Sequence, residues 1–490
     1  MIAAAVDRRP AERIRRALGR VPHGALMCLA LATVNAWIWA VVTPSFQVPD
    51  EVTHSAYVQY LAETGNVPRP IDTRANGRFH LSEEETVAVD GVPLSYDGVP
   101  SWSPIRDAAI RRLLSRPFVR VREAGAGPAA NYPPLYYAVE AVPYRLAHSG
   151  SFFDRLLAMR LVSALFAGAT AAFSFMFLRE LLPGAPWAWR VGGIAVALQP
   201  LLGFVSGGVN PDPLLWAASA AFLWLIARAF RRGLTTRVAV GIGIAVAVAL
   251  LTKSAAYALV PPAALALAVL ARRGAVRPAL VAASIAVAPF IAWLAVSSLA
   301  LHRGVGSAAT VAPAHRTSLG GQLAYLWETF LPRLPGMPHE FHHYPTYPLW
   351  QDYFQGLVGR FGYAEYGFSQ RVNWLALAIA VAILALVAAA LARARPALAR
   401  RRAELATYVL LVVAIVVGVA FAGYRFRTDT GVNFEQTRYL FPLLPLYGAL
   451  FALAVRGARR YGRIVGVLLV VLVVAQNGFS LLLTLQRYYT

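Results

Sequence analysis

The sequence PDEVTHSAYVQY, residues 49–60, places three ionisable side chains directly after a long apolar run. They are Asp50, Glu51 and His54, and on a helix Asp50, His54 and Tyr57 share one face. A carboxylate beside a low-dielectric boundary can act as a general base with a tuned pKa. Alternatively, Asp50 caps the helix, which stabilises it by about 1 kcal/mol, and Glu51 complements the helix dipole. Both interpretations are open on the local sequence.

Two cations are suited to bind an anion, Lys253 and Arg438. Lys253 is the only lysine in the chain, so a compact ammonium at this position suggests a point contact with phosphate. Arg438 precedes another apolar run and can form a forked contact with phosphate. The alternative for Lys253 is snorkelling at a helix end. Arg425 and Arg427, in the same loop as Arg438, either add positive charge or form salt bridges.

Two further stretches carry polar residues near the ends of apolar runs. NYPPLYYAVEAVPYRLA, residues 131–147, is amphipathic, and its Tyr132 either positions a substrate or packs at the membrane interface. GGVNPDPLLW, residues 207–216, contains Asn210 and Asp212. These two are either turn residues or further substrate-positioning groups.

The sequence predicts no metal site and no cofactor. His339 and His343 are four residues apart, but the spacing is not H-E-x-x-H, and prolines crowd the segment. We find no phosphate-binding glycine loop and no nucleophile elbow. The single cysteine, Cys28, lies in an apolar run and excludes a disulfide framework.

The elements that position these residues must lie in a membrane. Of the 490 residues, 58% are hydrophobic and only 14% are charged, which excludes an ordinary soluble protein. Long apolar runs recur, each about long enough to cross the ~30 Å hydrocarbon core. We therefore expect an all-α integral membrane protein of about eleven transmembrane helices, near 25–42, 156–178, 188–206, 213–230, 238–252, 256–271, 278–300, 373–392, 405–423, 439–455 and 464–485.

Arginine-rich loops predict the orientation of these helices. The first apolar run has no cleavage site after it and reads as an uncleaved signal anchor. Threading the helices alternately puts ARAFRRGLTTR, ARRGAVR, RARPALARRR and RGARRYGR on the same side as the basic N-terminus. The positive-inside rule then predicts a cytoplasmic N-terminus and an outside C-terminus. It also accounts for the formal net charge of +22, so we expect membrane lipid and no nucleic acid as a partner.

This topology divides the chain into four expected parts. Residues 1–24 form a basic cytoplasmic segment, and 25–300 form a catalytic transmembrane module. That module includes a large outside loop, 44–155, in which we expect amphipathic helices. A second outside loop, 301–372, precedes the C-terminal transmembrane helices of 373–490.

Four motifs occur in order: PDE..H..Y...L...G.VP, YPPLYY, N.D and TRYLFPLLP. The set resembles a bacterial family of predicted membrane proteins of unknown function near the GT-C superfamily of polytopic glycosyltransferases. The resemblance implies a GT-C-like fold in the bacterial cytoplasmic membrane, with the active site facing outside. It also implies a polyprenyl-monophosphate-linked sugar donor and a hydroxyl acceptor (glycan, lipid or protein). Carried over by position, Asp50 would be the general base, and Glu51 would help to orient substrate.

The chain departs from one part of this superfamily. Lipid A aminoarabinose transferases have an arginine–tyrosine pair after the acids, where this chain has His54. Acceptor binding is therefore not carried over.

The expected reaction is an inverting displacement at the anomeric carbon. Lys253 and Arg438 would stabilise the leaving phosphate, and the loss of either would raise the barrier by about 2–4 kcal/mol. His54, Tyr57, Tyr132, Asn210 and Asp212 would position the substrates. One alternative is an oligosaccharide polymerase or ligase with a diphosphate-linked donor. Another is a lipid or sugar transporter, which would carry polar groups at mid-membrane rather than at one interface.

Overall fold

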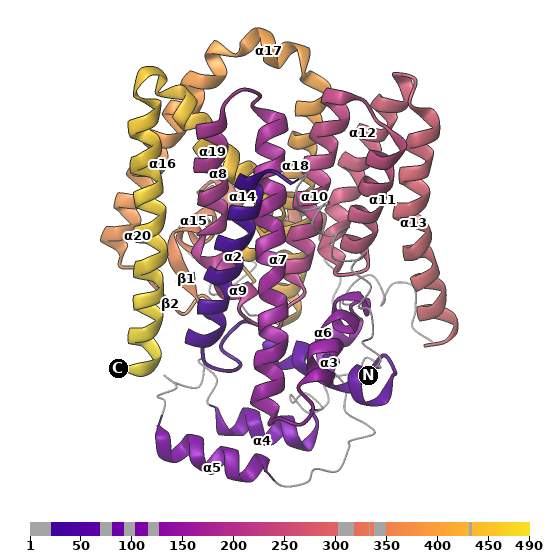
Figure 1. Ribbon diagram of the computed structural model, residues 1–490, viewed down its shortest axis with the longest axis vertical. Helices are drawn as coiled ribbons and strands as arrows, with labels where there is room; N and C mark the ends of the chain where they lie inside the picture. Colours follow the sequence, from indigo (N-terminus) through magenta and orange to yellow (C-terminus); the bar gives the residue numbers. More distant parts are fainter. Residues whose placement is uncertain are drawn as a thin grey trace, which may run out of the picture.

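The apolar runs of the sequence form long helices that stand side by side in one bundle (Figure 1). The computed structural model describes residues 21–68, 81–92, 103–115, 127–301, 318–332, 334–337, 349–430 and 434–490. The expected all-α membrane fold is confirmed. In the described part of the chain, nine helices are long and apolar enough to span a membrane: α2 (His23–Val42), α7 (Phe152–Leu181), α10 (Asp212–Arg232), η4–α12 (Ser254–Arg272), α13 (Val276–Leu299), α16 (Gln370–Arg393), α18 (Arg402–Thr430), η5–α19 (Thr437–Gly457) and η6–α20 (Arg459–Tyr489).

The two remaining predicted spans have a different form. The run at 188–206 is a pair, α8 (Pro186–Ala197) and α9 (Pro200–Ser206), bent by 47° at the break. Pro200 disfavours a continuous helix because it lacks an N–H, and the Gln199 side chain caps α9 by accepting from the Leu202 amide. The other run is α11 (Thr236–Leu250), whose fifteen residues cover about 22 Å.

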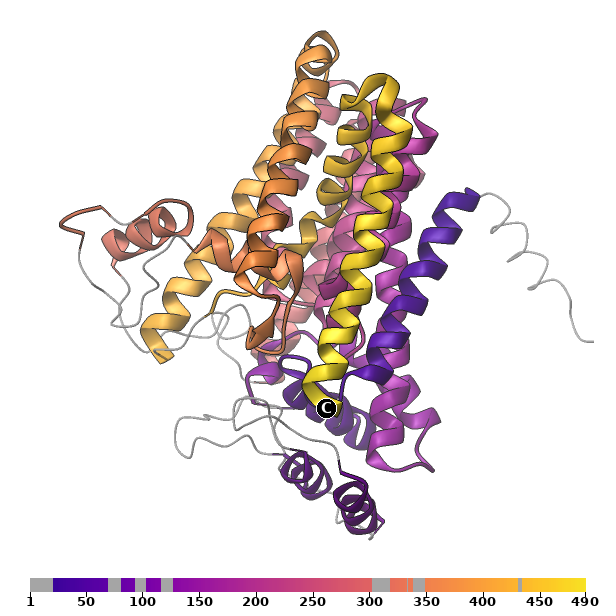
Figure 2. The same ribbon diagram turned by 90° about the vertical axis from the view of Figure 1, so that its left-hand side faces the viewer.

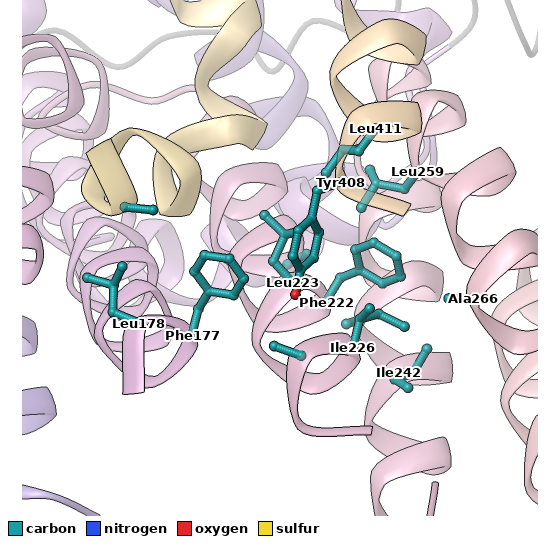
Figure 3. Packing of buried hydrophobic residues seen from close by; sticks show 14 of the residues in the cluster. Phe177, Leu178, Phe222, Leu223, Ile226, Ile242, Leu259, Ala266, Tyr408 and Leu411 are labelled. Carbon is teal, nitrogen blue, oxygen red and sulfur yellow. The ribbon is translucent and has the colours of Figure 1, made fainter. Parts of the chain in front are cut away.

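A large apolar core holds the bundle together and joins distant parts of the chain. It includes Phe177 of α7, Phe222 of α10 and Leu411 of α18 (Figure 3). Phe177 also meets Tyr408 of α18 edge to face, with ring centroids 5.5 Å apart. Helices from the middle and last thirds of the chain therefore share one interior.

A layer of shorter helices covers one end of the bundle, at the bottom of Figure 1. The Ser55 hydroxyl donates to Glu85 at 2.6 Å, and Arg155 pairs with Glu84, so the layer is fastened to the long helix α7. The C-terminus lies at this same end, while α17 (Arg395–Arg400), part of an arginine-rich loop, lies at the opposite end. The layer comprises α3 (Glu51–Thr64), α4 (Glu83–Gly91), α5 (Pro104–Leu114), η3 (Gly127–Asn131) and α6 (Leu135–Leu146).

Among the described residues, four elements directly precede α16 (Gln370–Arg393): a peripheral helix, a second helix and two short strands. The helix α15 (Trp350–Gly359) leads into a short hairpin, β1 (Arg360–Phe361) and β2 (Tyr366–Gly367), paired Arg360↔Gly367 and Phe361↔Tyr366. The Phe361 ring packs against Trp39 of α2 at 5.1 Å, and the Gln199 amide donates to the Leu357 carbonyl at 3.1 Å. The hairpin and α15 therefore lie against α2 and α9. The peripheral helix is α14 (Leu319–Phe330).

Candidate active site

Asp50 is the turning point between α2 and α3, and its side chain does not cap α3. Its φ of 66° is left-handed, which costs a non-glycine residue about 1–2 kcal/mol. Its backbone N–H donates to the Tyr363 hydroxyl at 2.9 Å. The side chain makes no capping hydrogen bond, so the capping interpretation is wrong. Instead the Asp50 carboxylate accepts from the Arg438 guanidinium, with 41% of the side chain exposed.

Arg438 is a buried cation with unused donors. It lies at the beginning of η5, is 2% exposed, and pairs with Asp50 through Nη2. Its Nη1 is 3.6 Å from Oδ2 of Asp212, and its guanidinium lies 5.1 Å from the centre of the Tyr439 ring. Nε and Nη1 are buried and make no hydrogen bond. Such donors are costly to leave unpaired, so this arginine is suited to receive an additional acceptor.

Asp212 links Arg438 to Lys253. The Lys253 ammonium donates to Asp212 Oδ1 at 2.7 Å and lies 5.6 Å from the centres of the Tyr132 and Tyr439 rings. Lys253 is buried in this ion pair, which does not fit the snorkelling alternative. Burial would lower the pKa of Lys253, but the Asp212 carboxylate, together with the neighbouring tyrosines, outweighs this effect and raises that pKa. The structure therefore contains an alternating chain of charges, Asp50–Arg438–Asp212–Lys253, which we call the charge chain.

Asn210 holds two segments of the site together. Its side-chain amide donates to the Pro49 carbonyl at 3.0 Å, and its side-chain oxygen accepts from the Asp212 amide at 2.9 Å. Asn210 thus serves as a turn residue and also braces the backbone beside Asp50 against the beginning of α10.

His54 and three tyrosines form an aromatic wall beside the charge chain. His54 Nδ1 shares a 3.0 Å hydrogen bond with the Tyr137 hydroxyl, and its ring lies 6.0 Å from Tyr132. Tyr57 stacks on Tyr137 at 3.6 Å and donates to the Tyr132 carbonyl at 3.3 Å. Burial lowers the pKa of His54 to about 3, despite the opposing effect of the Asp50 carboxylate. The imidazole is therefore neutral at ordinary pH and adds no charge to the site.

Glu51 faces a different partner from Asp50. It is fully buried and accepts from Arg160 Nε at 2.7 Å and Arg160 Nη2 at 2.5 Å. The amides of Phe46 and Val209 donate to it at 2.8 and 3.0 Å. Four donors occupy the carboxylate, so in this arrangement Glu51 fastens the Asp50 turn to α7 and to the 207–210 turn.

The sequence analysis missed Arg160, Tyr137, Tyr363 and Tyr439. For Arg160 a signal was available, because an arginine inside an apolar run is costly unless it is paired. For the tyrosines we find no signal in the sequence, since tyrosine is common at membrane interfaces.

A small cavity adjoins the charge chain on the side of α9 and α15. Its volume is about 30 Å³, enough for one or two water molecules and too small for a sugar. The Asp352–Arg360 ion pair, 2.9 Å long, lies in its wall. Its lining comprises Pro49, Leu201, Val205, Asp352, Gly356, Arg360, Gly362, Ala364, Glu435, Gln436, Thr437 and Arg438.

In the part of the chain that the structure describes, no three His, Cys, Asp or Glu side chains cluster as a metal site would require. His339 and His343 lie outside the described residues.

Comparison with known proteins gives one family. Residues 35–447 match the family described as "Predicted membrane protein (DUF2142)", which confirms the resemblance indicated by the ordered motifs. None of the curated protein sequences compared with the chain matches it.

Two solved structures have a similar arrangement of helices. One is ArnT from Cupriavidus metallidurans bound to undecaprenyl phosphate, at 13% identity and a TM-score of 0.45 over 88% of this chain and 59% of that one. The other is the archaeal oligosaccharyltransferase AglB from Archaeoglobus fulgidus, in complex with an inhibitory peptide and a dolichol-phosphate. Its identity is 11% and its TM-score 0.48, over 96% of this chain and 56% of that one. The chain thus spans less than two thirds of either protein, and neither likeness assigns it a substrate.

Proposed function

Because the chain belongs to the DUF2142 family of predicted membrane proteins and carries a buried charge chain at one end of its bundle, we propose that it is a membrane glycosyltransferase. It transfers a sugar from a polyprenyl-monophosphate donor to a hydroxyl acceptor on the outer face of the cytoplasmic membrane. The observation that carries the proposal is Arg438, a buried guanidinium that holds Asp50 and keeps two donors unused.

The donor phosphate binds between Arg438 and Lys253. Arg438 Nε and Nη1 supply a forked pair of donors, and Lys253 supplies a point charge. Asp212 keeps these two cations close together, since it contacts both. The charge chain holds two acids and two bases and is therefore neutral overall. A phosphate that binds here must therefore share Arg438 and Lys253 with the carboxylates of Asp50 and Asp212, which pair with them in its absence.

That sharing has a consequence for Asp50. The surrounding protein would raise the pKa of Asp50, but the nearby positive charges, above all the Arg438 guanidinium, together outweigh this effect and lower that pKa to about 2. A carboxylate of such low pKa is a weak base. When the phosphate accepts hydrogen bonds from Arg438, the Arg438 guanidinium stabilises the Asp50 carboxylate less, and the pKa of Asp50 rises. Donor binding itself therefore makes Asp50 a better base.

In the reaction, the acceptor oxygen attacks the anomeric carbon while its proton passes to Asp50. The bond between the anomeric carbon and the phosphate oxygen breaks, and polyprenyl phosphate leaves with the electron pair. The exposed part of the Asp50 side chain is available to the acceptor hydroxyl. Lys253 and Arg438 stabilise the leaving group most strongly in the transition state, where its charge develops. The adjoining cavity is smaller than a sugar, so the sugar does not bind inside that cavity as it stands.

The test uses the full chain in lipid vesicles with polyprenyl-monophosphate donors carrying radiolabelled sugars. We expect donor-dependent release of polyprenyl phosphate, and we expect Asp50→Asn to slow it at least about 100-fold. Asp107→Asn is the matched control, because Asp107 forms an exposed pair with Arg111 on α5. Full activity of the Asp50→Asn protein would refute the base assignment. Release of polyprenyl diphosphate from a diphosphate-linked donor would replace this proposal with a polymerase or ligase, and sugar uptake without transfer would indicate a transporter.

A further inference from the structure

The polarity of α14 is the reverse of that of a helix in water. Its outward face carries Leu319, Leu323 and Phe330, which are 72%, 58% and 49% exposed. Its inward face carries Glu328 and Thr329, both buried. An amphipathic helix on an aqueous surface directs its apolar residues inward and its polar residues outward. The exposed face of α14 therefore fits a hydrocarbon environment.

The place where α14 packs agrees with its polarity. Tyr325 lies 6.2 Å from the Tyr424 ring of α18, and the Ser318 and Tyr424 hydroxyls are 3.4 Å apart. Gly423 leaves room for this contact, since a Cβ there would clash with the Tyr325 hydroxyl. Figure 2 shows α14 standing out from the bundle beside α18.

The surface of α18 at this level is itself apolar. Val417, Phe421 and Phe426 are all exposed there, on both sides of the contact with α14 in the sequence. The outward face of α14 continues this surface. The same environment must cover both helices.

With twelve residues, α14 is about 18 Å long and cannot cross the ~30 Å hydrocarbon core. We propose that α14 is a membrane-embedded, non-spanning helix whose outward face, Leu319, Leu323, Trp327 and Phe330, contacts the acyl chains of bilayer lipid. Part of the segment 301–372 then lies within the membrane, where the sequence predicted an outside loop.

The inward face of α14 connects this membrane contact to the site. The Tyr325 hydroxyl donates to Glu435, which forms a forked pair with Arg427 at 2.8 and 2.6 Å. Glu435 precedes Arg438 by three residues and lines the cavity beside it. The helix that contacts lipid thus also steadies the segment entering η5.

A single spin label tests the proposal. Cys28 is the only cysteine and is buried, so Cys28→Ala gives a clean background for Leu323→Cys with a nitroxide. In phospholipid vesicles, we expect this label to be relaxed strongly by oxygen and weakly by a water-soluble nickel chelate. Leu468→Cys, at a 62% exposed position of the span α20, is the lipid-facing control. Thr86→Cys, on the exposed face of α4, is the aqueous control.

Three outcomes would overturn the proposal. A label at Leu323 that behaves like the one at Thr86 would put α14 in water. A label protected from both relaxants would indicate a protein contact. A label that becomes lipid-like only after undecaprenyl phosphate is added would assign the surface to a prenyl chain rather than to bilayer lipid. Leu319→Cys repeats the measurement at a second exposed position and guards against a local effect of one substitution.

Discussion

At the scale of single residues, the site consists of four charged side chains, and each of them forms an ion pair with another member of the charge chain. Buried ion pairs gain little stability over apolar packing, because desolvation offsets most of the attraction. A chain of four linked charges, three of them buried, is therefore poorly explained by stability alone. It is better explained by the anion that its cations are able to receive.

The pH dependence of the reaction should reveal the state of Asp50. In the free protein its pKa is lowered to about 2, so the carboxylate is ionised throughout the range in which the protein stays folded. We therefore expect kcat/KM, which reports the free enzyme, to show no acid limb in that range. Once phosphate shares Arg438, the pKa rises, so kcat should show an acid limb at higher pH. Steady-state rates across pH would measure both, and coinciding limbs would contradict the proposed sharing of Arg438.

Lys253 should contribute directly to phosphate affinity. A hydrogen bond to a charged group is worth about 1.5–3 kcal/mol, so Lys253→Met should weaken undecaprenyl phosphate binding by about tenfold or more. Binding is measured with tritiated undecaprenyl phosphate in nanodiscs. Lys253→Arg keeps the charge but replaces the compact ammonium with a larger, planar group, so it should recover only part of the affinity. Equal affinity of the Met variant and the natural protein would remove Lys253 from the phosphate site.

At the scale of elements, the site is assembled by contacts between segments that are far apart in the chain. The Glu51–Arg160 pair joins the beginning of α3 to α7, and Asn210 joins the Asp50 turn to α10. In addition, the hydroxyl of Tyr363, in the turn of the hairpin, accepts a hydrogen bond from the Asp50 backbone N–H. Three independent contacts thus support one left-handed residue, which explains how its strained backbone is retained.

Breaking the Glu51–Arg160 pair should destabilise the folded protein. Glu51→Gln leaves Arg160 buried without its counter-charge, which costs about 3–5 kcal/mol. The midpoint of thermal unfolding in detergent should fall clearly. Glu83→Gln, at an exposed position of α4, is the control and should leave the midpoint unchanged. A midpoint equal to that of the natural protein would mean that Glu51 is not a fastening residue.

Gly356 of α15 permits a close approach to η5. A Cβ at this position would clash with the Thr437 hydroxyl, which donates to the Tyr353 carbonyl at 2.8 Å. Gly356→Ala should push Thr437 outward and displace the neighbouring Arg438, at a cost of about 1–3 kcal/mol in packing. We expect transfer activity to fall several-fold. Gly320→Ala is the control, because a Cβ there meets open space on α14, and it should have no effect. Equal activity of the two variants would show that the contact between α15 and η5 does not affect the site.

At the scale of the whole molecule, the charges are distributed unevenly between the two ends of the bundle. The charge chain lies at the end that carries α3 and α6, while the arginine-rich α17 lies at the other (Figure 1). Combined with the positive-inside rule, this separation predicts that the site faces away from the cytoplasm.

Cysteine labelling tests that orientation. In the Cys28→Ala background, Thr86→Cys on α4 should react with a membrane-impermeant maleimide in intact spheroplasts. Ala399→Cys, exposed on α17, should react only after permeabilisation. The reverse pattern would contradict the predicted topology and with it an outward-facing site.

The sequence by itself determined which long segments are apolar enough to span a membrane, because transfer of an apolar run from water into hydrocarbon depends on the composition and length of the run. All eleven predicted runs form helices, although Pro200 divides one and another is short. Composition also singled out Lys253, and the ordered motifs identified the family.

Only the tertiary structure decided how the polar residues divide their roles. Asp50 and Glu51 are adjacent and chemically alike, yet one contacts Arg438 and the other Arg160, 388 and 109 residues away. The neutral state of His54 and the inverted polarity of α14 likewise depend on what packs against them. No local pattern encodes such contacts, because the energy of a buried charge is set by its partners in space rather than by its neighbours in sequence.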